Sequence, residues 1–270
     1  MSIADKLKEV AQNQQRVYDA GYEKSQDDIE HLNAELEQTL YGTDSGGKSH
    51  YDEFWDVYQN YGKRVTYQYA FAGDSPGWTE EIFQPKYDIR LTGGYTATSM
   101  FWGCPIKDMV AHLDEIGRNI DMSLCWYFNN TFQNTKSKRW GTISMINGKG
   151  ASYAFYNSSA DTIEKWIVNE SLGDLAYTFG ACVKLINLTI EGVIGQNGLN
   201  LSWSPLSKTS ITSVVNALSA TTSGLTATLR LAAVNAAFET TPGANNGSTS
   251  DEWLALAATK SNWTINLINS

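Results

Sequence analysis

A short pattern that recurs four times between residues 99 and 190 is the strongest constraint on how this chain folds. In each copy a Phe stands two positions after an aromatic or small residue, and the successive Phe residues are 27, 27 and 24 positions apart. A period of this length is typical of leucine-rich repeats and is shorter than that of the helical repeats. The copies begin Ser99-Met100-Phe101, Trp126-Tyr127-Phe128, Tyr153-Ala154-Phe155 and Tyr177-Thr178-Phe179.

Apolar runs follow the last three copies, at residues 142–146, 163–168 and 185–190. The last two runs predict strands, because they are rich in β-branched residues and partly alternate. One such repeat cannot bury its own apolar face, whereas stacked repeats share a continuous core. The pattern therefore predicts an α/β fold, a short irregular solenoid with parallel β rungs joined by helices and turns. The expected repeat core is a column of Phe101, Phe128, Phe155 and Phe179, with Cys104 and Cys182 three residues after their Phe.

Chance is the alternative explanation of the repeat, because aromatic residues make up 12% of the chain. The second copy fits least well, since the basic run at residues 136–139 interrupts it. The recurrence of strand-like runs downstream of the Phe residues favours a true repeat.

The N-terminal part has a different pattern. Residues 2–20 predict a helix with a narrow apolar seam, and a second helical stretch continues the seam in a shifted phase. A narrow seam favours packing against copies of the same chain or against a partner, with a helix folded back on its own domain as the alternative. We expect residues 1–42 to anchor a homo-oligomer, with a trimer as the first hypothesis. The seam residues are Ile3, Leu7, Val10, Val17, Ile29, Leu32 and Leu36.

The rest of the chain divides by composition. Residues 43–49 predict a flexible linker, residues 50–98 an aromatic N-terminal cap, and residues 99–270 the solenoid with its C-terminal cap. Within the last segment we expect helices at residues 105–118, 209–218 and 250–259, and strands at residues 225–231 and 263–268. Residues 192–205 predict a loop-rich stretch, and residues 240–248 a surface loop.

Charge and cysteine content exclude several classes of function. The net charge of −9 argues against nucleic-acid binding and against docking on an anionic membrane. We expect no membrane insertion, since no apolar run approaches about 18 residues. We also expect synthesis in a cytoplasm without export by the usual route, since the N-terminus carries no apolar signal region. Cys104, Cys125 and Cys182 are expected to be buried free thiols rather than a disulfide framework or a zinc site.

No motif for nucleotide, metal or nucleophilic chemistry is present in the sequence. His31, His50 and His112 are isolated, so we expect solvated roles for them and no cofactor or metal. A pair of carboxylates for glycoside hydrolysis needs only proximity in space. The visible clusters, at residues 52–56, 80–81 and 114–115, are expected on helix starts or helix surfaces, where carboxylates are ordinarily solvated. The sequence therefore predicts a protein that is not an enzyme.

Aromatic side chains are the better indication of function. The chain has 9 Trp and 14 Tyr, residue types that stack on sugar rings and are enriched at interfaces. Alternate positions of a strand face opposite sides, so some of the aromatics within the repeats should be exposed. Trp140, Tyr156 and Trp166 are the candidates for contact with a surface ligand, and the alternative is that they fill the core in place of leucine.

Two segments resemble known families. Residues 50–89 resemble a module of tailed-phage and prophage proteins, and TFGACVKLINLTI at residues 178–190 resembles the BspA-type leucine-rich repeat, whose core is Ala-Phe-x-x-Cys followed by a Leu-x-x-Ile run. The resemblance implies a phage virion protein of the tail, baseplate or a fibre, whose repeat domain binds a glycan or protein of the host surface. Its N-terminal helix would bind other virion proteins. A head fibre or decoration protein and a glycan-degrading tail enzyme are the alternatives.

Overall fold

The computed structural model describes residues 71–72, 80, 83–85, 88–90, 96–238 and 250–268. The chain divides into two compact units, residues 1–63 with 85–89 and residues 64–84 with 90–270, and almost all described residues belong to the second. The described part is a mixed α/β structure with parallel sheets and four helices. The expected helical anchor with its seam, the linker, the loop at residues 240–248 and most of the aromatic cap lie outside the described residues.

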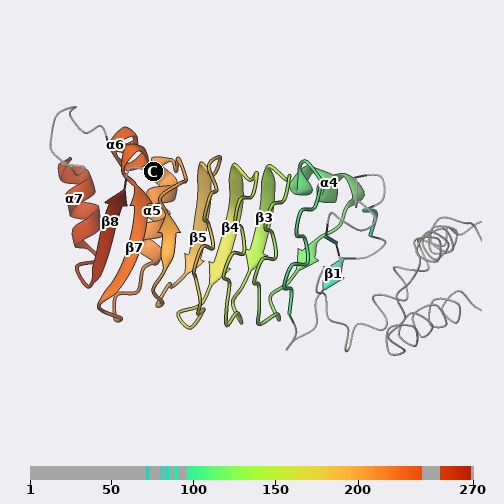
Figure 1. Cartoon of the computed structure of the whole chain (residues 1–270), viewed down its shortest axis with the longest axis horizontal. Helices are drawn as coiled ribbons and strands as arrows, with labels where there is room; N and C mark the ends of the chain where they lie inside the picture. Colours follow the sequence, from blue (N-terminus) through green and yellow to red (C-terminus); the bar gives the residue numbers. More distant parts are fainter. Residues whose placement is uncertain are drawn as a thin grey trace, which may run out of the picture. The chain divides into compact units, whose positions relative to one another are not determined.

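The elements follow one another as Figure 1 labels them. Three of the expected helices and all of the expected strands are present, within a few residues of their predicted limits. The stretch at residues 192–205 contains a strand, β6, that we did not expect, and α6 was not expected either. The bounds are β1 (Ile89–Arg90), α4 (Met109–Ile116), β2 (Ile120–Asp121), β3 (Arg139–Ser144), β4 (Thr162–Val168), β5 (Asn187–Gly192), β6 (Leu199–Leu201), α5 (Lys208–Ala217), β7 (Leu225–Arg230), α6 (Leu231–Ala237), α7 (Asp251–Ala258) and β8 (Trp263–Ile268).

The central sheet joins β3, β4 and β5, which lie side by side and run parallel (Figure 1). Its register aligns the buried side chains of successive strands: Trp140 pairs with Ile163 and Ile163 with Leu188. Further along, Ile143 pairs with Trp166, which pairs with Ile190. Parallel strands need long connections, and here each connection carries one copy of the recurring pattern. A second parallel sheet joins β6, β7 and β8.

Helix α5 closes the outer edge of the central sheet. Its Ser210 and Ser213 hydroxyls accept hydrogen bonds from the backbone N–H groups of Leu188 and Ile190, both at 2.8 Å. The helix starts at this place because the Ser207 side chain caps it by accepting a bond from the Ser210 N–H. An edge strand exposes unpaired backbone groups, and the two serines satisfy those of β5.

A column of stacked phenylalanine rings runs through the core. The ring centroids of Phe101 and Phe132 are 5.8 Å apart, those of Phe132 and Phe155 4.8 Å, and those of Phe155 and Phe179 5.2 Å, with interplanar angles of 5°, 11° and 3°. Phe71 extends the column beyond Phe101 at 5.3 Å. All of these side chains are fully buried.

The expected place of Phe128 in this column is wrong. Phe128 is buried, as are Cys104 and Cys182, but the ring that stacks between Phe101 and Phe155 belongs to Phe132. The aromatic residue two positions before Phe128 suggested the wrong register, whereas Phe132 is preceded by Asn130 and Thr131. With Phe132 in the column, the first interval is 31 residues (132 − 101) and the second is 23 (155 − 132), where the sequence pattern gave 27 for each.

We predict that Phe155→Ala lowers the free energy of unfolding by about 3–5 kcal/mol, because it removes a ring that is stacked on both faces and leaves a cavity. Urea denaturation monitored by circular dichroism measures the change. Val183→Ala, in the same part of the fold but 56% exposed, is the matched control and should change stability by no more than about 0.5 kcal/mol. Equal losses in the two variants would contradict the importance of the column.

Candidate functional site

Each turn around a column phenylalanine uses two left-handed residues. The first lies two positions before the Phe, and the second lies two positions after it. In the turns of Phe101, Phe132, Phe155 and Phe179, the first residues have φ of 55°, 58°, 56° and 55°, and the second 65°, 59°, 53° and 57°. The first row is Ser99, Asn130, Tyr153 and Tyr177, and the second row is Gly103, Asn134, Asn157 and Ala181.

Backbone hydrogen bonds between successive turns hold these rows in register. Every second N–H of one turn donates to a carbonyl of the next: Tyr153 to Ala176 at 2.9 Å, Phe155 to Thr178 at 2.8 Å and Asn157 to Gly180 at 2.8 Å. The same spacing joins the turn of Phe132 to that of Phe155, and the turn of Phe101 to that of Phe132. Residues at the same place in successive turns therefore form a row on the surface.

Tyr153 and Tyr177 are unusual occupants of the first row. Glycine, Asn and Asp adopt the left-handed conformation most readily, whereas bulky side chains are rare there. Asn130 fits this preference, but the two tyrosines do not. Backbone strain of this kind is concentrated at functional sites, so these two positions are the first place to look for a function.

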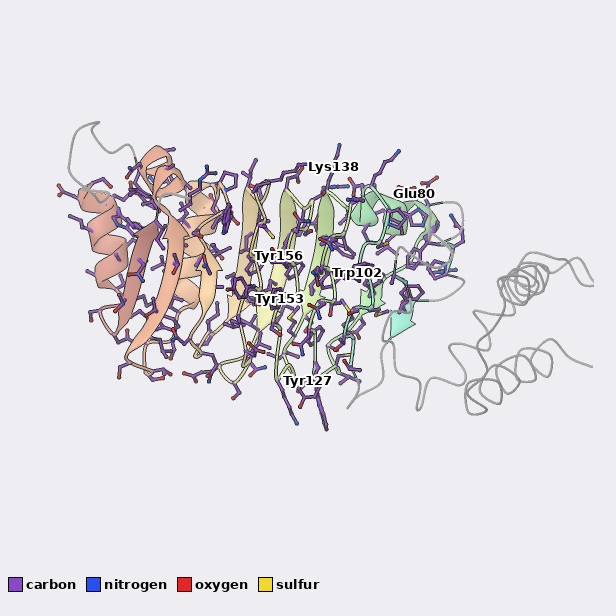
Figure 2. The ribbon with its side chains drawn as sticks, in the orientation of Figure 1. Glu80, Trp102, Tyr127, Lys138, Tyr153 and Tyr156 are labelled. Carbon is purple, nitrogen blue, oxygen red and sulfur yellow. The ribbon has the colours of Figure 1, made fainter. Side chains whose placement is uncertain are left out.

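The two tyrosines form an exposed cluster with Tyr156. The rings of Tyr153 and Tyr177 stack with centroids 4.9 Å apart, and the Tyr156 ring lies 5.3 Å from that of Tyr153. Gly180 provides the room, because a Cβ there would lie 2.9 Å from the Tyr156 ring. Tyr153 is 37% exposed and Tyr177 54%, and Figure 2 shows Tyr153 and Tyr156 close together on one face. We call Tyr153, Tyr156 and Tyr177 the tyrosine patch.

The tyrosine patch is chemically suited to binding rather than to catalysis. The stacking of Tyr153 on Tyr177 covers one face of each ring, while 37% and 54% of the two residues stay exposed. Each phenol both donates and accepts hydrogen bonds. Asn157, next to Tyr156, donates from its side-chain amide to Asn134 at 2.8 Å, so a fixed row of amides continues the neutral surface. Such a surface offers apolar contact and hydrogen bonding without a fixed charge.

Of the three aromatic residues expected to contact a ligand, only Tyr156 lies in this surface. Trp140 is 3% exposed and Trp166 is fully buried, so the expectation for these two is wrong. Trp140 packs against Phe132, Trp166 packs against Phe179, and both residues belong to the strand rows that face the core. The sequence analysis did not identify Tyr153 and Tyr177 as surface residues. The available signal was their position in the recurring pattern, two residues before a Phe that faces the core.

The titratable groups of the described residues form no catalytic arrangement that we recognise. His112 is buried rather than solvated as expected, and its Nε2 is hydrogen-bonded to the backbone carbonyl of Phe83. Asp114 and Glu115 are exposed on α4, as expected. Within the described ranges there is no group of three or more His, Cys, Asp or Glu residues placed to hold a metal ion. No helix of this part of the chain is long and apolar enough to cross a membrane.

Comparisons with known proteins do not assign the chain to a family. No family model matches the sequence, and neither a curated protein nor a solved structure matches it. The function is therefore argued from the residues and their geometry.

We predict that Tyr177→Asn unfolds at higher urea concentration than Tyr177→Ala, with a difference of about 0.5–1 kcal/mol, because Asn tolerates the left-handed conformation better. Both variants lose the contact with Tyr153, so the comparison isolates the backbone effect. The same pair of substitutions at Val183, which has no positive φ, is the control and should show no advantage for Asn. A Tyr177→Asn variant that is less stable than Tyr177→Ala would argue against strain at this position.

The three cysteines provide a second test. They are free and buried, as expected, and burial raises the pKa of each thiol to about 12. The thiolate is the reactive form, so we predict that none of the three reacts with Ellman's reagent at pH 8 in the native protein and that all three react in 6 M guanidinium chloride. Rapid reaction of a native thiol would place that cysteine on an accessible surface.

Proposed function

We propose that the described residues form a short irregular solenoid of the leucine-rich-repeat type that resembles BspA repeats. The support is the phenylalanine column, the parallel register of β3, β4 and β5, and the backbone bonds that join equivalent residues of successive turns. Helices α4 and α5 then take the place of a strand in the units on either side of the central sheet (Figure 1).

We propose further that the protein is a non-enzymatic binding protein of a phage particle. It belongs to the tail, the baseplate or a fibre, and its repeat domain attaches to a glycan or protein of the host surface. The observation that supports binding best is the tyrosine patch, because two exposed aromatic side chains occupy backbone positions where Asn or Gly would cost less. The assignment to a virion, and with it the contact of the N-terminal helix with other virion proteins, rests on the sequence resemblance alone. The role of residues 1–42 as the anchor of a homo-oligomer, with a trimer as the first hypothesis, rests on their narrow apolar seam.

The geometry explains how such a surface binds. Backbone hydrogen bonds join the turn of Tyr153 to that of Tyr177, and the two rings stack on each other, so little conformational freedom remains to be lost on association. Tyrosine gives a large contact area with few rotatable bonds, and it is common in rigid binding surfaces for that reason. The C–H groups of a sugar or an aliphatic side chain would pack on the exposed ring surface, and the phenols would exchange hydrogen bonds with hydroxyl or amide groups.

We predict that replacing both exposed tyrosines, as Tyr153→Asn with Tyr177→Asn, weakens binding to host cell walls by about 30-fold or more, since interface hot spots contribute about 2 kcal/mol or more. The measurement is sedimentation of labelled protein with cell walls from a panel of Gram-positive and gut bacteria. Asn suits the left-handed positions, so loss of binding is separated from loss of stability.

The matched control is Val183→Asn with Val193→Asn, which changes two exposed apolar residues outside the patch. Unchanged wall binding by the tyrosine variant would show that the patch is not the binding surface. New reducing ends after incubation would support the glycan-degrading alternative instead. Electron microscopy of the virion with labelled protein distinguishes a tail from a head fibre or decoration protein.

A further inference from the structure

The four turns around the column phenylalanines carry no charged residue. Each turn contributes eight successive residues, from four positions before its Phe to three positions after it, and none of them is Asp, Glu, Lys, Arg or His. By contrast, 18% of the whole chain is charged. We call these segments the neutral band, and they are residues 97–104, 128–135, 151–158 and 175–182.

The neutral band includes residues that reach the solvent. Surface positions in proteins are ordinarily rich in charged side chains, so burial in the core explains only part of the missing charge. The side chains that reach the solvent are aromatic, amide-bearing or small. Trp102, Asn130, Gln133, Asn134 and Tyr156 are half-buried, while Tyr153, Asn157 and Tyr177 are exposed.

One row of the neutral band extends the tyrosine patch across the two preceding turns. Trp102, Gln133 and Tyr156 each stand one position after a column Phe. Their turns are joined by backbone hydrogen bonds, in which the N–H of Gly103 donates to the Gln133 carbonyl at 2.8 Å and that of Asn134 to the Tyr156 carbonyl at 3.0 Å. Trp102 therefore marks the far end of a row whose other end is the tyrosine patch (Figure 2).

The spacing and chemistry of these rows favour one shape of ligand. The rings of Tyr153 and Tyr177 lie 4.9 Å apart, and the column rings beneath the turns lie 4.8–5.8 Å apart. One equatorially linked pyranose unit advances an extended glycan chain by a similar length. The hydroxyl groups of such a chain can exchange hydrogen bonds with phenols and amides. A charged polymer would lose hydration on the neutral band without meeting an opposite charge.

We propose that the neutral band binds a linear, uncharged, β-1,4-linked glycan that lies along the stacked turns, with about one sugar unit per turn. The inference rests on the proposed function, because this glycan would be the host-surface ligand of the tyrosine patch. Tyr153 and Tyr177 contact two adjacent units, and Gln133 and Trp102 contact the next two. The C–H groups of the sugars pack on the aromatic rings, and their hydroxyl groups bond to the phenols and amides.

The test measures how affinity depends on the length of the glycan. Calorimetry on the full-length protein uses two neutral series, β-1,4-linked oligomers of glucose and of N-acetylglucosamine with two to six units. In at least one series the tetramer should bind about tenfold more tightly than the dimer, and longer oligomers should add little. The β-1,4-linked glucuronic acid tetramer, which differs from the glucose tetramer by its carboxylates, should bind about tenfold more weakly than that series predicts.

Variants then locate the ligand on the band. Gln133→Ala with Trp102→Ala should lower the affinity for the tetramer to that for the dimer. Its affinity for the dimer should stay unchanged, which also shows that the fold is retained. Trp126→Ala is the matched control, because Trp126 is exposed outside the neutral band, and it should bind both oligomers as the wild-type protein does. Tyr153→Asn with Tyr177→Asn should weaken binding of both oligomers.

Three results would overturn the neutral-glycan site. They are binding of neither series, equal affinity for dimer and tetramer in both series, and a tetramer affinity that the Gln133 and Trp102 substitutions leave unchanged. Wall binding that still depends on the tyrosine patch would then leave the proposed function standing, with an anionic polymer or a protein as the ligand. Wall binding that the double tyrosine variant leaves unchanged would remove the proposed function itself.

Discussion

The structure depends on the stacking of phenylalanine rings between turns that are closed by two left-handed residues each. The left-handed positions, two residues before and two residues after each Phe, turn the chain so that the ring points inward and every second N–H points to the next turn. The Phe132–Phe155 and Phe155–Phe179 ring distances of 4.8 and 5.2 Å are close to the spacing of about 4.7–4.9 Å between hydrogen-bonded strands, and the Phe101–Phe132 distance of 5.8 Å is somewhat longer. Side-chain packing and backbone bonding therefore stabilise the same register, and neither could shift without the other.

The phenylalanine stacking is retained although the repeats differ greatly in the segment that follows each Phe. The first unit contains an eight-residue helix where the following ones have a strand, and yet Phe101 and Phe132 stack as closely parallel as the later pairs. A helix also follows the central sheet at β5, where two serine hydroxyls replace the hydrogen bonds of a further strand. At the other edge, helix α4 is joined to the start of β3, where the Met109 N–H donates to the Ser137 hydroxyl.

The same turns create the surface that we propose to be functional. Residues of the first left-handed row lie next to one another on the surface. Tyr153 and Tyr177 therefore add exposed rings at the position that Asn130 occupies in the preceding turn, and the phenylalanine column continues unchanged. Stability and binding are thereby separated: the phenylalanines determine the fold, and the residues two positions before them determine the surface.

The sequence by itself determined the strands β4, β5, β7 and β8, helices α4, α5 and α7, and the buried state of the cysteines, because these follow from local periodicity and composition. It could not distinguish Phe128 from Phe132 as the member of the column, since both are buried and the choice depends on the backbone bonds between turns, in which Phe101 donates to Thr131 and Phe132 to Ala154. It also could not decide that Trp140 and Trp166 face inward while Tyr153 and Tyr177 face outward. Those orientations follow from the pairing of strands and turns that are more than twenty residues apart, and only the tertiary structure brings these together.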